Sequence, residues 1–164
     1  MKKEIVIKSC YSLLRRKTPL KSDCGKICNG KCCAGDEKTG MIIFPGEEDM
    51  IDENMKIFKN SAGYSVAVCN GSCDRNKRPL ACRIYPLFPL HVSEDGETLI
   101  KTVFDYRADC PLCQGGYEFD KGFIKAVRRV GKFLLLNEET AEVYRKLSSE
   151  FDEYYELMEK FGKS

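Results

Sequence analysis

The chain has 164 residues, with ten cysteines, one histidine, no tryptophan and a net charge of +2. This length suits a single domain with a buried core. A content of 43% hydrophobic and 32% charged residues excludes a disordered, collagen-like or coiled-coil chain. The nearly balanced charge gives no overall attraction to nucleic acid or acidic membranes. The single histidine, His91, excludes a zinc site built from two histidines.

The N-terminus does not have the pattern of a secretory signal. Only three apolar residues (5–7) separate the basic start from Lys8, whereas a signal peptide needs about 7–15 of them. No apolar run approaches the roughly 20 residues that a membrane span needs. We therefore expect a cytoplasmic protein with reduced thiols and no membrane contact. Clustered cysteines in that compartment are more often metal ligands or redox groups than disulfides.

The elements predicted for the first part of the chain are short. An apolar strand over Met41–Phe44 ends at a Pro-Gly turn, and an acidic first turn favours a helix from Glu47 to about Phe58. Tyr64–Val68 is rich in residues that favour β-strands. Two further strands, Leu87–Val92 and Thr98–Tyr106, flank a segment containing Asp-Gly and predict a hairpin.

Residues after Gly116 contain no cysteine and have helical periodicity. Asp120 and Asn137 are each placed to cap a helix. The short connection between these helices predicts an antiparallel helical hairpin. We expect an α+β fold in one domain over residues 1–164, with a cysteine-rich metal-stapled half (1–116) followed by the hairpin (117–164).

The two C-terminal helices carry opposite charge. Residues 119–134 have five basic side chains against one acidic side chain, whereas residues 138–160 have eight acidic against three basic. The basic helix could bind nucleic acid, but an acidic neighbour is a simpler partner for it and makes nucleic acid the less favoured reading. A protein partner remains an alternative.

Nine cysteines fall into closely spaced groups. Close spacing lets thiolates reach one metal ion at a small loop-closure cost. The first group has the spacing C-x3-C-x3-C-C, the second is a C-x3-C pair followed by a single cysteine, and the third is C-x2-C. The candidate metal ligands are Cys24, Cys28, Cys32, Cys33, Cys69, Cys73, Cys82, Cys110 and Cys113. The tenth, Cys10, stands alone and is expected in the core.

A set of clustered thiolates suits zinc or an iron–sulfur cluster and disfavours magnesium and calcium. Zinc is slightly favoured over iron as the simpler choice. Arg78 and Arg83 could donate to metal-bound thiolates or form surface ion pairs, and the two alternatives are equal. Tyr85 and Phe88 are expected in the core, and His91 is expected to be structural.

These residues resemble the YkgJ-like cysteine-cluster family, also described as the CxxCxxCC zinc- or iron-chelating domain. The similarity covers roughly residues 24–144, and its most specific element is Arg-Pro-Leu-Ala-Cys-Arg-Ile-Tyr-Pro at residues 78–86. The later Cys110-Pro111 also matches, whereas the opening spacing is x3, x3 rather than x2, x2. Eight of the nine candidates align with the family, and Cys113 is an addition.

The resemblance implies a zinc or iron site. We expect this site to be structural or regulatory rather than catalytic. Eight thiolates could fill two four-ligand sites, or one site with the remaining cysteines in the core. A related cysteine-cluster domain occurs in flagellin lysine N-methylases, so an iron–sulfur-dependent redox or N-methylation-related enzyme is an alternative. An interaction module using the basic helix is another. The sequence contains no catalytic residues that can be placed, and whether the protein is an enzyme stays open.

Overall fold

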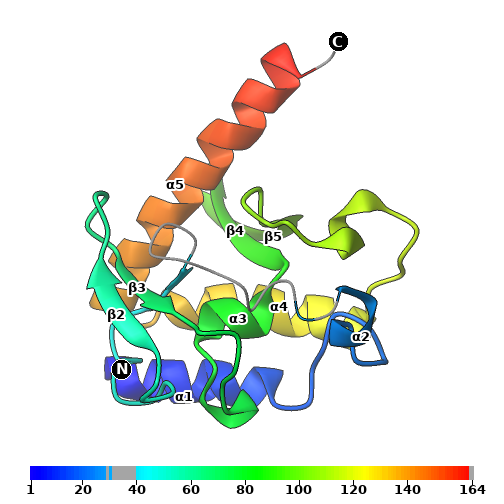
Figure 1. Ribbon diagram of the computed structural model, residues 1–164. Helices are drawn as coiled ribbons and strands as arrows, with labels where there is room; N and C mark the ends of the chain where they lie inside the picture. Colours follow the sequence, from blue (N-terminus) through cyan, green and yellow to red (C-terminus); the bar gives the residue numbers. More distant parts are fainter. Residues whose placement is uncertain (29, 31–39, 163–164) are drawn as a thin grey trace.

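The computed structural model describes residues 1–28, 30 and 40–162, and within them the fold is α+β (Figure 1). The first two helices are α1 (Lys3–Leu14) and α2 (Gly25–Cys28). In chain order, the other elements are β1 (Met41–Ile42), β2 (Lys56–Lys59), β3 (Ser65–Val68), η2 (Arg75–Lys77), α3 (Leu80–Ile84), β4 (Leu87–Glu94), β5 (Glu97–Phe104), η3 (Pro111–Gln114), α4 (Lys121–Leu134) and α5 (Glu138–Phe161).

The strands form two separate antiparallel sheets. One has the order β1-β3-β2, with Met41 opposite Ala67 and Phe58 opposite Val66. The other is the β4–β5 hairpin, whose turn residues Asp95 and Gly96 have φ values of 51° and 79°. Positive φ at both central residues is typical of a type I′ turn, which explains the Asp-Gly pair. The hairpin and the strand over residues 64–68 are therefore confirmed.

The main core lies between the hairpin and three helices. α1 packs along α4, and both α4 and α5 cover β4. Phe88 of β4 stacks on Phe151 of α5 with ring centroids 3.9 Å apart, and the Tyr144 hydroxyl donates a hydrogen bond to the Pro89 carbonyl. Phe88 is thus core as predicted, whereas Tyr85 is only half-buried.

Two predictions about the first half were wrong or incomplete. Residues 47–58 do not form a helix: they make turns and then strand β2, which pairs with β3. The acidic first turn misled the prediction, because the Glu47 carboxylate is buried and accepts the N–H groups of Phe44 and of Leu80, the first residue of α3. The sequence analysis also did not anticipate α1, which buries Val6, Ile7 and Cys10.

Both predicted C-terminal helices are present, and both predicted caps are confirmed. The Asp120 carboxylate accepts from the Phe123 N–H at 2.9 Å, and the Asn137 side chain accepts from the Thr140 N–H at 3.2 Å. α5 rises steeply from α4, and its last turns extend beyond the rest of the molecule (Figure 1). Among the described residues, every helix is too short or too polar to cross a bilayer.

The Asp120 cap gives a direct test of the α4 boundary. Asp120→Ala should lower the free energy of unfolding by about 1 kcal/mol, because the Phe123 N–H loses its acceptor. Thermal unfolding should show a decrease in Tm of about 2–4 °C. Glu142→Ala, at an exposed position inside α5, is the control and should change Tm little. Equal effects of the two variants would contradict the cap.

Candidate metal centre

The first thiol group is built on a short turn and helix. The Asp23 carboxylate accepts from the Gly25 N–H at 3.0 Å and forms an ion pair with Arg75 at 3.3 Å. These contacts place the start of α2, which carries Cys24 just before it and Cys28 at its end. The Cys28 thiol lies 3.8 Å from the Cys24 carbonyl oxygen, to which it donates. Both thiols therefore lie along one turn of chain and are half-buried.

The C-x2-C pair is built on a second tight turn. Pro111 occupies the first position of η3, where its missing N–H costs nothing. The Cys113 N–H donates to the Cys110 carbonyl at 3.0 Å, which brings the two thiols within interaction distance of each other. Gly115 follows with a φ of 87°, a conformation that favours glycine and turns the chain away.

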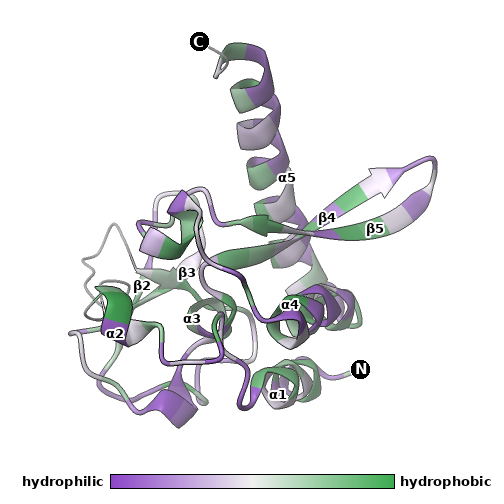
Figure 2. Ribbon diagram, turned by 90° about the vertical axis from the view of Figure 1, so that its right-hand side faces the viewer, coloured by the Kyte–Doolittle hydropathy of each residue, from purple (hydrophilic) through white to green (hydrophobic). Residues whose placement is uncertain are grey.

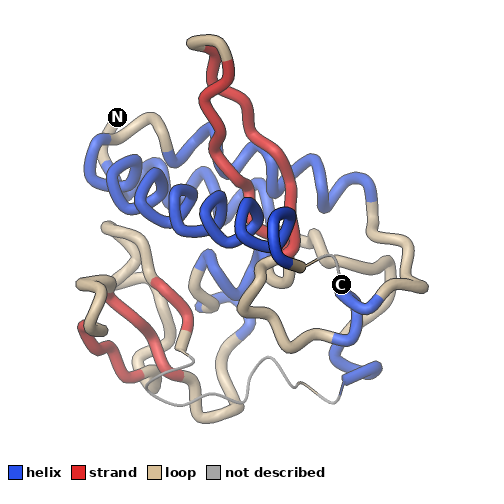
Figure 3. Tube along the Cα trace, turned by 90° about the horizontal axis from the view of Figure 1, so that it is seen from above, coloured by secondary structure: helices blue, strands red, loops and turns tan. Residues whose placement is uncertain are grey.

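These two turns meet, although more than eighty residues separate them along the chain. α2 lies beside η3, the yellow-green turn before α4 in Figure 1, at the end of the molecule opposite the three-stranded sheet (Figures 1 and 3). Burial raises the pKa of Cys24, and the nearby Cys28 and Cys110 thiols raise it further. Burial, with Cys110 close by, raises the pKa of Cys113 to about 11. We refer to Cys24, Cys28, Cys110 and Cys113 as the α2–η3 thiols.

A separate pair lies at the far end of β3. Cys69 and Cys73 pack against the small cluster of Ile43, Ile51, Met55 and Ala67. Burial raises the pKa of Cys73, while a hydrogen bond from Arg78 opposes that rise. Arg78 therefore lies beside the Cys73 thiol, and its donation to a metal-bound thiolate stays a prediction.

Cys82 belongs to α3 and faces a third environment. It lies near Tyr11, whose pKa is raised mainly by burial. Arg83 covers the Tyr11 ring at 4.0 Å from the ring centroid. The same guanidinium donates to the carbonyls of Arg78 and Asn76 at 2.8 and 2.7 Å. Arg83 therefore joins segments of backbone, a role that neither sequence reading anticipated.

Two residues that were excluded from the ligand set have structural positions, as predicted. Cys10 is fully buried in α1, and burial raises its pKa to about 12. The His91 ring makes an edge contact with Tyr144 at 6.1 Å, and the His91 N–H donates to Ser148. Burial, aided by Arg145, lowers the pKa of His91.

The donor set fits a thiolate-bound metal in its chemistry, since thiols from two turns lie near one another. Cys32 and Cys33, which the sequence also indicated as ligands, lie outside the described residues. Within residues 1–28, 30 and 40–162, no three or more Cys, His, Asp or Glu side chains are arranged closely enough to hold an ion. The structure thus brings candidates together without assembling a complete site.

Sequence analysis missed the buried carboxylate network around Glu47. Its Oε1 accepts from the Tyr11 hydroxyl at 2.7 Å and from the Leu80 N–H at 2.6 Å, and its Oε2 accepts from the Phe44 N–H at 2.6 Å. Burial raises the pKa of Glu47 to about 7. The sequence did contain a signal for this buried carboxylate: a glutamate that directly follows Pro-Gly in an apolar segment. This network attaches the start of α3, and with it Cys82, to the core.

Comparison of the chain with protein-family models, with curated proteins and with solved structures gave no match. The resemblance to the YkgJ-like family therefore stays a prediction, and the argument for function depends on the positions of the thiols.

Proposed function

We propose that this protein binds zinc or an iron–sulfur centre through clustered thiolates, and that the metal has a structural or regulatory role. The observation that carries this proposal is the meeting of Cys24 and Cys28 with Cys110 and Cys113. Thiols from such distant segments have no need to converge for packing alone, since the main core lies elsewhere. Bound metal would hold α2 against η3 in a region that contains few long elements.

Metal content tests this proposal directly. Anaerobically purified protein should contain close to one or more equivalents of zinc or iron per chain. A colourless, zinc-loaded protein would identify a zinc site, and a brown protein absorbing near roughly 400 nm would identify an iron–sulfur cluster. A content well below one equivalent of both metals would refute the proposal.

Variants then locate the site. Cys24→Ser and Cys110→Ser should each lose most of the bound metal, because each removes one thiolate from the meeting turns. Cys10→Ala is the matched control, since its buried thiol lies in α1 and should not affect metal content. Cys69→Ser tests the separate pair of Cys69 and Cys73 at the end of β3 in the same way. If only Cys69→Ser lost its metal, the metal site would instead lie at that pair.

Chelation should have a local effect on the fold. If metal alone held the cysteine-rich half together, chelation would unfold everything before Gly116, but α1, β4 and β5 share the main core with α4 and α5. We therefore expect faster amide hydrogen exchange at α2 and η3 after chelation, with α1 and α4 still protected. Uniform loss of protection over the whole chain would show that the metal supports the core as well.

A further inference from the structure

The last turns of α5 present an apolar stripe that nothing within the described chain covers. Leu157, Met158 and Phe161 are 55%, 47% and 79% exposed, whereas Tyr154, one turn earlier on the same face, stacks on Tyr106 with ring centroids 4.2 Å apart. The spacing i, i+3, i+4, i+7 places all four side chains along one face of a helix. We refer to residues 152–161 as the free end of α5: the Tyr155 hydroxyl still donates to the Phe104 carbonyl, and the turns after it extend beyond the body of the molecule (Figures 1 and 2).

The free end of α5 is acidic. Asp152, Glu153, Glu156 and Glu159 face only Lys160, which gives this segment a net charge of −3. None of these acids forms an ion pair within the described part of the chain, where the α5 ion pairs are those of Glu138 and Glu139 at its start. The segment is thus an exposed amphipathic helix with an acidic polar face.

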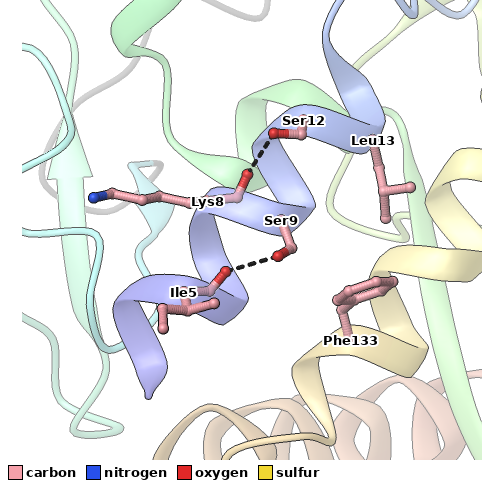
Figure 4. Close-up of a pocket in the computed structure, with 6 residues that line it drawn as sticks. All are labelled: Ile5, Lys8, Ser9, Ser12, Leu13 and Phe133. Carbon is pink, nitrogen blue, oxygen red and sulfur yellow. Dashed lines mark hydrogen bonds between the residues drawn. The ribbon is translucent and has the colours of Figure 1, made fainter. Parts of the chain in front are cut away.

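The opposite side of the molecule carries a groove of complementary character. It lies between α1 and α4 and has a volume of about 410 Å³. The Ser9 and Ser12 hydroxyls that line it donate to carbonyls of their own helix at 2.8 and 3.0 Å (Figure 4). Ile5, Leu13 and Phe133 supply its apolar walls. A segment bound in this groove would therefore contact apolar side chains and hydroxyls that already donate hydrogen bonds within α1.

Cations border this groove. Lys8 lines it, and Arg129 lies one helical turn before Phe133 on the same face of α4. Neither forms an ion pair with another described residue, and the same holds for the other exposed basic residues of α4, Lys121, Lys125, Arg128 and Lys132. Within the described chain, no ion pair joins the basic residues of α4 to the acidic residues of α5. Figure 2 shows the outward side of α4 as hydrophilic.

We propose that the free end of α5 docks into the α1–α4 groove of a second copy of this chain. Its apolar stripe has the anchor spacing that helices use when they bind in grooves. Its acids would meet Arg129 and the neighbouring basic side chains of α4, so charge complementarity selects this occupant. The two surfaces cannot meet within one copy, because the free end of α5 points away from α1 (Figure 1). Reciprocal docking closes a dimer, whereas one-way docking continues to further copies.

Sedimentation and light scattering of the metal-replete protein test this proposal. At low salt the mass should rise with protein concentration to at least two chains, and higher salt should weaken the association. Phe161→Asp should weaken it about tenfold or more, because a charged group replaces the most exposed anchor. A mass of one chain at every concentration, or unchanged association of Phe161→Asp, would overturn the proposal.

Charge reversal separates this contact from other uses of the basic helix. Glu153→Lys and Arg129→Glu should each weaken association, and a mixture of the two variants should restore it. The controls are Glu142→Lys, at an exposed position near the start of α5, and Arg128→Glu, which helical spacing places on another face of α4 from Phe133. Both should associate like the unaltered protein.

Binding of nucleic acid by the basic helix would give a different pattern of results. Salt-dependent oligonucleotide binding by a single-chain species, weakened equally by Arg128→Glu and Arg129→Glu, would overturn the proposal in favour of a nucleic-acid surface.

Discussion

Replacing Glu47 by glutamine should change how the stability of this protein depends on pH. The Glu47 pKa is raised from 4.5 to about 7 by burial, so the folded state holds this proton more tightly than the unfolded state does. The protonated Glu47 carboxyl therefore contributes to the free energy of unfolding. This contribution is fully present below pH 4.5 and is lost as pH rises through 7. At about 1.4 kcal/mol for each pKa unit, the loss amounts to about 3 kcal/mol.

Glutamine cannot ionise, so it does not undergo this loss. Its NH₂ group must face the Phe44 N–H, which should make Glu47→Gln less stable than the unaltered protein by about 1–3 kcal/mol at pH 4.5. That deficit should shrink by about 3 kcal/mol, and so close or reverse, by pH 7.5. Urea unfolding at intervals between these values measures the change.

The control for this experiment is Glu53→Gln, at an exposed position in the same segment. It should differ from the unaltered protein by less than about 0.5 kcal/mol at each pH, as surface substitutions usually do. A constant difference between Glu47→Gln and the unaltered protein over the whole range would show that Glu47 is ionised throughout. The hydrogen bonds from Tyr11 and Leu80 would then outweigh its desolvation.

Gly131→Ala should destabilise the protein by about 2 kcal/mol, because the core has no room for the added methyl group. A Cβ at this position would lie 2.5 Å from the Tyr144 hydroxyl oxygen and 3.0 Å from two carbons of Ile100. The Tyr144 hydroxyl cannot easily move, since it donates to the Pro89 carbonyl. The better helix propensity of alanine, worth up to about 1 kcal/mol, offsets only part of this clash.

A second glycine of the same helix provides the matched control. A Cβ at Gly122 would meet the flexible end of the Lys17 side chain at 2.9 Å and the Asp120 carboxylate at 3.0 Å. Gly122→Ala should therefore cost much less stability than Gly131→Ala in denaturant unfolding, although its Cβ approaches the Asp120 oxygen that caps α4. Adding Tyr144→Phe should recover part of the loss in Gly131→Ala, because the closest atom is removed. Equal effects of the two alanine substitutions would contradict close packing at Gly131.

Local signals were most reliable where a single interaction determines the structure. Asp120 and Asn137 cap helices through their own side chains, so these boundaries can be read from neighbouring residues. Asp95-Gly96 favours its turn in the same local way. Prediction failed at Glu47, because its acidic side chain satisfies the N–H of Leu80, thirty-three residues away, instead of starting a helix.

The sequence by itself determined the α+β class, the two capped C-terminal helices, the β4–β5 hairpin and the set of candidate thiols. Each depends on periodicity, spacing or turn chemistry within a few residues. Only the tertiary structure decided that Cys24 and Cys28 meet Cys110 and Cys113 while Cys69 and Cys73 form a separate pair. It also decided that the cations of α4 and the acids of α5 do not pair within the described chain. The physical reason is that these contacts join distant segments, and their geometry depends on how α1, the hairpin and the helices pack into one core.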